Sequence, residues 1–413
     1  MKILHTSDWH LGRNLYTKKR YEEFTLFLNW LTDVIESEDI DLLLISGDIF
    51  DTTIPSHYSQ MLYYQFLYRV STTNCQAVVI TGGNHDSPTF LDAPKALLET
   101  LNVYVVGSMR EDVAQEVITF YDDSHTPKAI ICAVPYLRDK DIRTVESGET
   151  IDDKDKKLIS GIKDHYEKVC AIASLRQTEY LSSFNAKVPI IAMGHLFSTG
   201  GVVTDGDGMR DLYVGSLGSV HEDIFPTCID YLALGHLHSA QKVGSKEHYR
   251  YSGSPIPMGF GEAKQQKKVL LISFDNTTPN INEYSVPLFQ RLERLKGTLE
   301  EIQTAVDELI TQNSDAWLEI ELSEHTRAQE AKIALEEQVE KSKLHIIRIK
   351  DIHFIDSVLL SAYKNETLDD VDEYEVFERL LAAYEIENEE KKELIDSYKE
   401  ILFAIQNEDT LKE

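Results

Sequence analysis

The chain has 413 residues, a formal net charge of −29 and a sequence pI of about 4.8. Its 42% hydrophobic and 27% charged residues are typical of a globular protein, and no apolar run reaches the roughly 18 residues that a membrane helix needs. The acidity argues against a general polyanion binder, and four cysteines without a Cys-x-x-Cys pair indicate a cytoplasmic protein with neither a thiolate zinc site nor a disulfide framework.

The first two thirds of the chain alternate short apolar runs with amphipathic segments. The predicted strands are Lys2–Thr6, Leu42–Ser46, Val78–Thr81, Ala129–Val134, Ile190–Met193, Tyr231–Leu234 and Val269–Phe274. Most of them are continuous apolar runs, as expected for strands that are covered on both faces. A helix is predicted over Tyr21–Ile35, where the apolar residues fall on one stripe. The pattern predicts an α/β core of two sheets with helices outside, over residues 1–275.

A polar stretch around Asp275–Pro287 interrupts this pattern, and a small α+β domain is predicted over 288–351. A C-terminal helical segment is predicted over 366–408, within a region that holds 17 Asp and Glu against 5 Lys and Arg between Glu366 and Glu413. The apolar residues that share one face of its two helices are Phe377, Leu380, Leu381, Tyr384, Leu394, Tyr398 and Ile401. These faces either pack on each other and on the α+β domain, or dock a partner.

Five short motifs follow predicted strands. They are Asp8-Trp9-His10, Gly47-Asp48, Gly83-Asn84-His85-Asp86, Gly194-His195 and Gly235-His236-Leu237-His238. Because ligand sites in α/β proteins gather at the carboxyl ends of strands, we expect these loops to converge although they are far apart in the sequence. Carboxylates, an amide and imidazoles without thiolates suit manganese, magnesium, iron or zinc. The predicted metal ligands are Asp8, His10, Asp48, Asn84, His195, His236 and His238.

In this order the motifs resemble those of the calcineurin-like metallophosphoesterase superfamily, and most closely those of its SbcD family of double-strand-break repair nucleases. Thr6-Ser7-Asp8-Trp9-His10-Leu11-Gly12-Arg13 and Tyr251-Ser252-Gly253-Ser254-Pro255-Ile256 add to the likeness, which covers essentially the whole chain. The resemblance implies a two-sheet metallophosphoesterase core with flanking helices, a small capping domain and C-terminal helices.

The resemblance also implies how the site is divided. One metal ion is assigned Asp8, His10, Asp48 and His238, and the other Asp48, Asn84, His195 and His236. His85 matches the family's catalytic histidine, and its neighbour Asp86 is expected either to orient it or to cap its own loop. Asp51 stands where archaeal and eukaryotic relatives carry a second histidine, so a mechanism with two histidines does not transfer.

The activity that the resemblance implies is ATP-dependent 3′–5′ double-strand exonuclease and single-strand or hairpin endonuclease action in DNA recombination, replication and repair. Mn²⁺ is the expected cofactor, with Mg²⁺ as the alternative. The expected partners are DNA ends and hairpins and an SbcC-type SMC-like ATPase that supplies the ATP dependence, around a homodimer in a nucleoid-associated heterotetramer. The alternative function is a phosphatase or small-molecule phosphodiesterase; Thr52-Thr53 after Asp51 lacks the arginine typical of the protein phosphatases.

Basic residues cluster locally despite the net negative charge. Those predicted to contact DNA are Arg13, Lys18, Lys19, Arg20 and Arg138. The alternative interpretation is a set of ordinary solvated surface charges. Contacts of this kind would bind phosphates without reading sequence.

Overall fold

The computed structural model describes residues 1–122, 124–143, 150–185, 187–198, 220–323 and 328–351, together with 381, 394–395 and 397–398. The chain divides into two compact units, Met1–Glu293 and Arg294–Glu413. Most of the predicted partner-docking segment lies outside the described residues, including Phe377, Leu380, Tyr384 and Ile401. Of its other members, Leu381 is buried, Leu394 is exposed and Tyr398 is half-buried.

The first unit contains two six-stranded sheets. From edge to edge the first sheet consists of β14 (Thr278–Ser285), β13 (Lys268–Asp275), β1 (Lys2–Thr6), β4 (Leu42–Ser46), β5 (Ala77–Thr81) and β6 (Val103–Val106). The four strands from β1 to β6 are parallel, whereas β13 and β14 are antiparallel to their neighbours. The carboxyl ends of β1, β4 and β5 therefore meet at one edge.

The second sheet also has four adjacent parallel strands, but one antiparallel strand at each edge. It consists of β11 (Gln241–Val243), β12 (Lys246–Tyr251), β10 (Tyr231–Gly235), β9 (Ile190–His195), β8 (Pro127–Ala133) and β7 (Val117–Tyr121). Its four central strands are parallel, and its two edge strands are antiparallel to their neighbours. The ends of β9 and β10 thus lie side by side.

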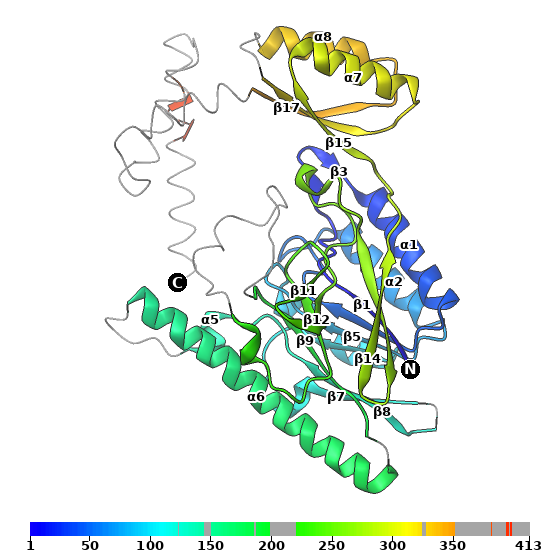
Figure 1. The fold of residues 1–413 in the computed structure, drawn as a ribbon, viewed down its shortest axis with the longest axis vertical. Helices are drawn as coiled ribbons and strands as arrows, with labels where there is room; N and C mark the ends of the chain where they lie inside the picture. The colour runs from blue at the N-terminus through cyan, green and yellow to red at the C-terminus, as the bar shows by residue number, and fades with distance from the viewer. Residues whose placement is uncertain are drawn as a thin grey trace. The chain divides into compact units, whose positions relative to one another are not determined.

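The helices of the first unit cover the outer faces of the two sheets (Figure 1). They are α1 (Tyr21–Ser37), α2 (His57–Val70), α3 (Pro88–Asp92), α4 (Lys95–Glu99), α5 (Asp139–Ile142) and α6 (Ile151–Phe184), with the 3₁₀ turns η1 (Val113–Glu116), η3 (Glu222–Ile224) and η4 (Phe260–Glu262). Apolar residues of α1 and α2 pack on the first sheet, and those of α6 pack on the second. A third cluster fills the space between the sheets. The predicted two-sheet α/β core is confirmed.

The polar stretch that was expected to end the core forms part of it. β14 pairs with β13 over eight residues, from Lys268 opposite Ser285 to Asp275 opposite Thr278. The first unit consequently runs to Glu293, whereas the sequence predicted that it ends at residue 275. β14 is an edge strand whose residues are exposed or half-buried, which is why its sequence lacks an apolar run.

The second unit is a small α+β domain. Its elements are β15 (Leu292–Gly297), α7 (Leu299–Thr311), β16 (Trp317–Leu322), α8 (Ala328–Val339) and β17 (His345–Asp351). The strands form one sheet in the order β15-β16-β17, with β16 and β17 parallel, and α7 and α8 contribute to its apolar core. No helix within the described part of the chain is long and apolar enough to span a bilayer.

Candidate metal centre

All five motifs lie where parallel strands end. Asp8 and His10 follow β1, Asp48 follows β4 and Asn84 follows β5, while the remaining motifs end β9 and β10 in the other sheet. Backbone hydrogen bonds continue between the first two loops, because the Asp8 N–H donates to the Gly47 carbonyl and the His10 N–H to the Asp48 carbonyl, both at 3.0 Å. The two sheets thereby bring all seven predicted ligands to one place.

Two glycines are needed for this convergence, for different reasons. Gly47 has a φ of +80°, and a Cβ there would lie 2.2 Å from His195 Nδ1. Gly235 has no such φ, but a Cβ would lie 1.9 Å from the Ser46 carbonyl oxygen. Gly47 is therefore required by its backbone conformation as well as by space, whereas Gly235 is required by the close approach of the second sheet to the first.

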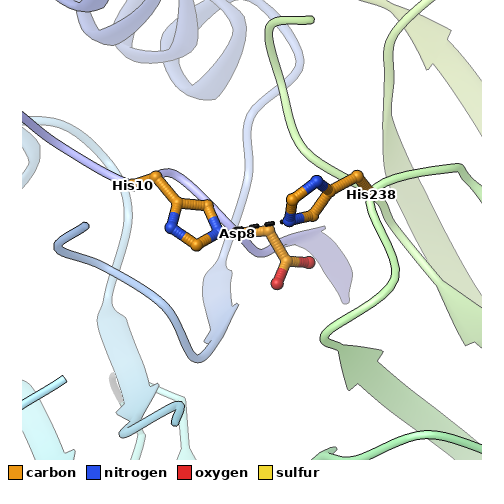
Figure 2. Close-up of side chains that lie close together, drawn as sticks. All are labelled: Asp8, His10 and His238. Carbon is orange, nitrogen blue, oxygen red and sulfur yellow. Dashed lines mark hydrogen bonds between the residues drawn. The ribbon is translucent and has the colours of Figure 1, made fainter. Parts of the chain in front are cut away.

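Asp8, His10 and His238 form the first group of candidate ligands (Figure 2). His10 Nε2 lies 3.2 Å from His238 Nε2 and 3.6 Å from Asp48 Oδ2. Asp8 Oδ1 accepts the backbone N–H of His236 at 2.8 Å. These nitrogen and oxygen atoms come from both sheets and face one another, as the ligands of a single cation would.

A second group is centred on Asp48 and Asn84. His195 Nε2 lies 3.3 Å from Asp48 Oδ2 and 3.0 Å from Asn84 Oδ1. Asn84 Oδ1 is also 3.1 Å from His236 Nδ1. Asp48 therefore contacts members of both groups, which fits the bridging role predicted for it.

The chemistry of these atoms fits divalent cations. His195 donates its Nδ1–H to the Ser46 carbonyl at 3.0 Å, so its Nε2 faces Asp48 carrying either a proton or a cation. His10 and His238 face each other through ring nitrogens in the same way. Carboxylate, amide and imidazole donors without a thiolate suit Mn²⁺, Mg²⁺, Fe²⁺ or Zn²⁺.

In the metal-free protein, one of the candidate ligands, His195, is protonated at neutral pH. Burial disfavours charge on His195, but the Asp48 carboxylate outweighs it and raises the pKa of His195 to about 9. Burial lowers the pKa of His10 to about 4 and that of His236 to about 3, so both are neutral near pH 7. Burial also opposes the ionisation of Asp48, yet His195 holds its pKa well below the usual range.

We expect cation binding to strengthen as pH rises. Below pH 9 the metal-free protein carries a proton on His195 that a cation at Nε2 must displace, so affinity should fall by up to about tenfold per pH unit between pH 8 and 6. His10 and His236 add nothing in this window because they are already neutral. Calorimetric Mn²⁺ titrations in two buffers of different ionisation enthalpy measure the protons released. Binding without proton release would contradict this ionisation of His195.

His85 lies beside this centre. Its Nδ1–H donates to the backbone carbonyl of Asp51 at 2.9 Å, so Nε2 is the nitrogen that can meet a substrate. The His85 ring is 4.8 Å from that of His10, at nearly a right angle. The side chain of Asp51 lies 3.1 Å from Arg13 and 3.4 Å from His10 Nδ1. Asp51 is thus placed to orient three groups around the centre.

The structure contradicts the prediction that Asp86 orients His85. Both carboxylate oxygens of Asp86 accept backbone N–H groups, from Ile49 at 3.1 Å, Phe50 at 2.9 Å and Gly83 at 2.9 Å. The partner of His85 is Asp51 instead. Asp86 joins the loop after β5, which carries Asn84, to the loop after β4, which carries Asp48.

The structure also contradicts the prediction of a DNA contact for Arg20. This side chain is buried, and its guanidinium donates to the Glu23 carboxylate at 2.7 and 2.8 Å and to the Pro257 carbonyl at 2.6 Å. Lys18 and Lys19 lie in a short hairpin with β2 (Asn14–Leu15), where Lys19 is exposed. Arg138 is partly exposed and pairs with Asp141. Apart from Arg20, the predicted DNA contacts stay predictions.

Two residues outside the motifs complete the surroundings of His238. Its Nδ1 lies 3.3 Å from the carboxylate of Glu262, which forms a buried ion pair with Lys267. Burial opposes the ionisation of Glu262, but Lys267 prevails and lowers the pKa of Glu262 to about 2. Nothing in the local sequence distinguishes this glutamate from a surface residue, and Lys267 is one of three lysines between 264 and 268.

Comparison with known proteins identifies the family. The calcineurin-like phosphoesterase family matches residues 1–240, and the family described as Type 5 capsule protein repressor C-terminal domain matches 288–385. The chain is 34% identical over 398 residues to the SbcD component of the SbcCD nuclease of Escherichia coli K12, which covers 95% of this chain and 96% of that protein. The Bacillus subtilis protein of the same name is 31% identical over 78% of this chain and 79% of its own length. The chain belongs to the SbcD family of calcineurin-like phosphoesterases.

Proposed function

We propose that the chain is the nuclease subunit of an SbcCD-type complex and hydrolyses DNA phosphodiesters with two divalent cations. The observation that carries this proposal is the meeting of seven residues with nitrogen or oxygen donors from two sheets, among which Asp48 contacts members of both ligand groups. Near full-length similarity to proteins named as components of a nuclease supports the choice of DNA as substrate.

The contacts support the division of ligands that the resemblance implies. Asp8, His10 and His238 would hold one ion and Asn84, His195 and His236 the other, with Asp48 shared between them. Two such ions, with Mn²⁺ as the proposed metal, would supply Lewis-acid activation of a water and neutralisation of charge on the phosphate. The protein's part is to fix the donors. The Ser46 carbonyl and the Glu262 carboxylate do this for two of the imidazoles by accepting hydrogen bonds from His195 Nδ1 and His238 Nδ1.

His85 would act on the substrate side of the centre. With Nδ1 donating to the Asp51 carbonyl, Nε2 is left to hold or deliver a proton at the leaving oxygen. Asp51 keeps this ring in place through its backbone, so no second histidine is required for the orientation of His85. We assign Arg13, 3.1 Å from Asp51, to the phosphate backbone of the bound strand.

We further propose an SbcC-type ATPase as the partner, docked by the C-terminal segment 366–408, within a heterotetramer built around a dimer of this chain. The net charge of −29 supports a partnered enzyme, because a strongly acidic chain needs additional cationic surface to hold DNA. ATP dependence would enter through the partner. The 3′–5′ double-strand exonuclease and hairpin endonuclease activities belong to the same proposal.

An assay on two kinds of substrate tests the function. We expect the purified full chain to cleave DNA ends and hairpins with Mn²⁺, to lose that activity with EDTA, and to gain ATP dependence when the SbcC-type partner is added. Turnover of p-nitrophenyl phosphate under the same conditions measures phosphomonoesterase activity. Phosphomonoester turnover without DNA cleavage, with and without the partner, would favour the phosphatase alternative and overturn the proposal.

A further inference from the structure

The ring of His238 is held on both sides. Figure 2 shows it facing His10 beside Asp8, where the two Nε2 atoms are 3.2 Å apart. The other ring nitrogen, Nδ1, lies 3.3 Å from Oε1 of Glu262. Because a carboxylate at this distance accepts a hydrogen bond, the proton of the neutral ring is placed on Nδ1, and the lone pair of Nε2 is directed to the side of the ring where His10 and Asp8 lie.

Glu262 is itself fixed in place. It is 0% exposed, and its second oxygen, Oε2, accepts the backbone N–H of Met258 at 3.0 Å and pairs with the Lys267 ammonium. A buried carboxylate of this kind is costly unless its charge is matched and its lone pairs are used. Both conditions are met here, so the position of Oε1 relative to His238 is determined by the surrounding structure.

Lys267 supports the same histidine by a second route. Its ammonium, in a residue only 6% exposed, donates to the backbone carbonyl of His238 and to Ser254 Oγ, each at 3.0 Å. The Lys267 ammonium therefore fixes both the backbone of His238 and the Glu262 carboxylate behind its ring.

We propose that Glu262 and Lys267 are positioning residues for one of the two metal ions: the pair fixes the orientation and tautomer of His238, so that Nε2 is presented to the ion shared with Asp8 and His10. This inference rests on the assignment of His238 as a ligand in the proposed function. It predicts an effect on one ion only. Glu262 accepts a hydrogen bond from the His238 ring, Lys267 donates one to the His238 carbonyl, and His238 is assigned to that ion alone.

The test replaces both charges at once, since either single substitution would leave an unmatched charge buried. We expect the full-length Glu262→Gln/Lys267→Met variant to bind one Mn²⁺ about 10- to 100-fold more weakly, while the affinity for the other is unchanged. Two-site Mn²⁺ titrations followed by the electron paramagnetic resonance signal of free Mn²⁺ measure both constants. Glu262→Asp keeps the charge but shortens the side chain. It should lower the affinity for the same Mn²⁺ ion and serves as a milder second variant.

A matched control is available in the same unit. Lys242 and Glu247 also form a lysine–glutamate pair, but they are 50% and 68% exposed. Lys242→Met/Glu247→Gln should leave both Mn²⁺ constants unchanged. If the Glu262 variants that fold, judged by circular dichroism, bind both ions like the wild type, the proposal is wrong and the buried pair is purely structural.

A His238→Asn variant separates this proposal from the one on which it rests. Loss of one ion in His238→Asn together with wild-type binding in the folded Glu262 variants would overturn the positioning role alone. Wild-type binding of both ions by His238→Asn would overturn the ligand assignment and the positioning role with it. We expect His238→Asn and the Glu262 variants to lose affinity for the same Mn²⁺ ion.

Discussion

Replacing Asp48 with asparagine should lower the rate of Mn²⁺-dependent DNA cleavage by at least about 10³-fold, because the metal ions' contribution of several kcal/mol to the transition state depends on their being held together. Asp48 Oδ2 is 3.3 Å from His195 Nε2 and 3.6 Å from His10 Nε2, so this oxygen contacts both ligand groups. An amide keeps the shape but removes the negative charge that the two cations would share in the proposed site. We expect both Mn²⁺ affinities to fall together.

The control for this variant flanks the same strand. Asp41 immediately precedes β4, at the opposite end from Asp48, and accepts the Lys2 backbone N–H at 2.7 Å. Asp41→Asn should bind Mn²⁺ and cleave DNA like the wild type. A multiple-turnover assay on a duplex end, combined with Mn²⁺ titration, measures both quantities; cleavage by Asp48→Asn within about tenfold of the wild type would exclude a bridging carboxylate.

The continuous apolar runs made the two-sheet core predictable. In β4, Leu43 and Ile45 pack with the helices on the outer face, while Leu42 and Leu44 fill the space between the sheets. Since every residue of that strand is buried on one side or the other, its sequence is apolar almost throughout. The edge strand β14 has no such constraint, and its polar sequence could not be told from a linker.

The convergence of the five motifs was predictable for a related reason. Each motif directly follows a buried parallel strand, so the sequence determines both the residue type and the sheet edge at which it emerges. The residues that support the site from outside the motifs have no such sequence pattern. Arg20 reaches the carbonyl of Pro257, which is 237 positions away, and looks like a surface arginine until that contact is known.

Asp86 illustrates the limit of arguments from sequence proximity. It is adjacent to His85, yet its carboxylate turns to the backbone of Ile49 and Phe50 in the neighbouring loop. Successive residues in a loop need not point the same way, and three backbone N–H groups bind a carboxylate better than one imidazole does. The orientation of His85 falls instead to a backbone carbonyl, a group that every residue has and no motif reveals.

His85→Ala should separate catalysis from metal binding. We expect kcat to fall by about 10²- to 10⁴-fold, the usual contribution of a proton-transferring side chain, while both Mn²⁺ affinities remain those of the wild type. The physical reason is that His85 is not one of the seven proposed ligands, and its imidazole is held by the Asp51 carbonyl through Nδ1. Single-turnover DNA cleavage at saturating Mn²⁺ measures the chemical step.

The backbone makes this substitution informative. The His85 N–H donates to Asp48 Oδ1 at 2.9 Å, and alanine keeps that N–H, so the shared carboxylate should stay in place when the imidazole is lost. His221→Ala is the control, since this exposed ring pairs with Asp223 and is not among the centre's residues. Weaker Mn²⁺ binding in His85→Ala would make the imidazole a contributor to the metal site, whereas an unchanged kcat would remove it from the reaction. Loss of rate with intact Mn²⁺ binding would place its action on the DNA, because only the substrate side of the centre would then have changed.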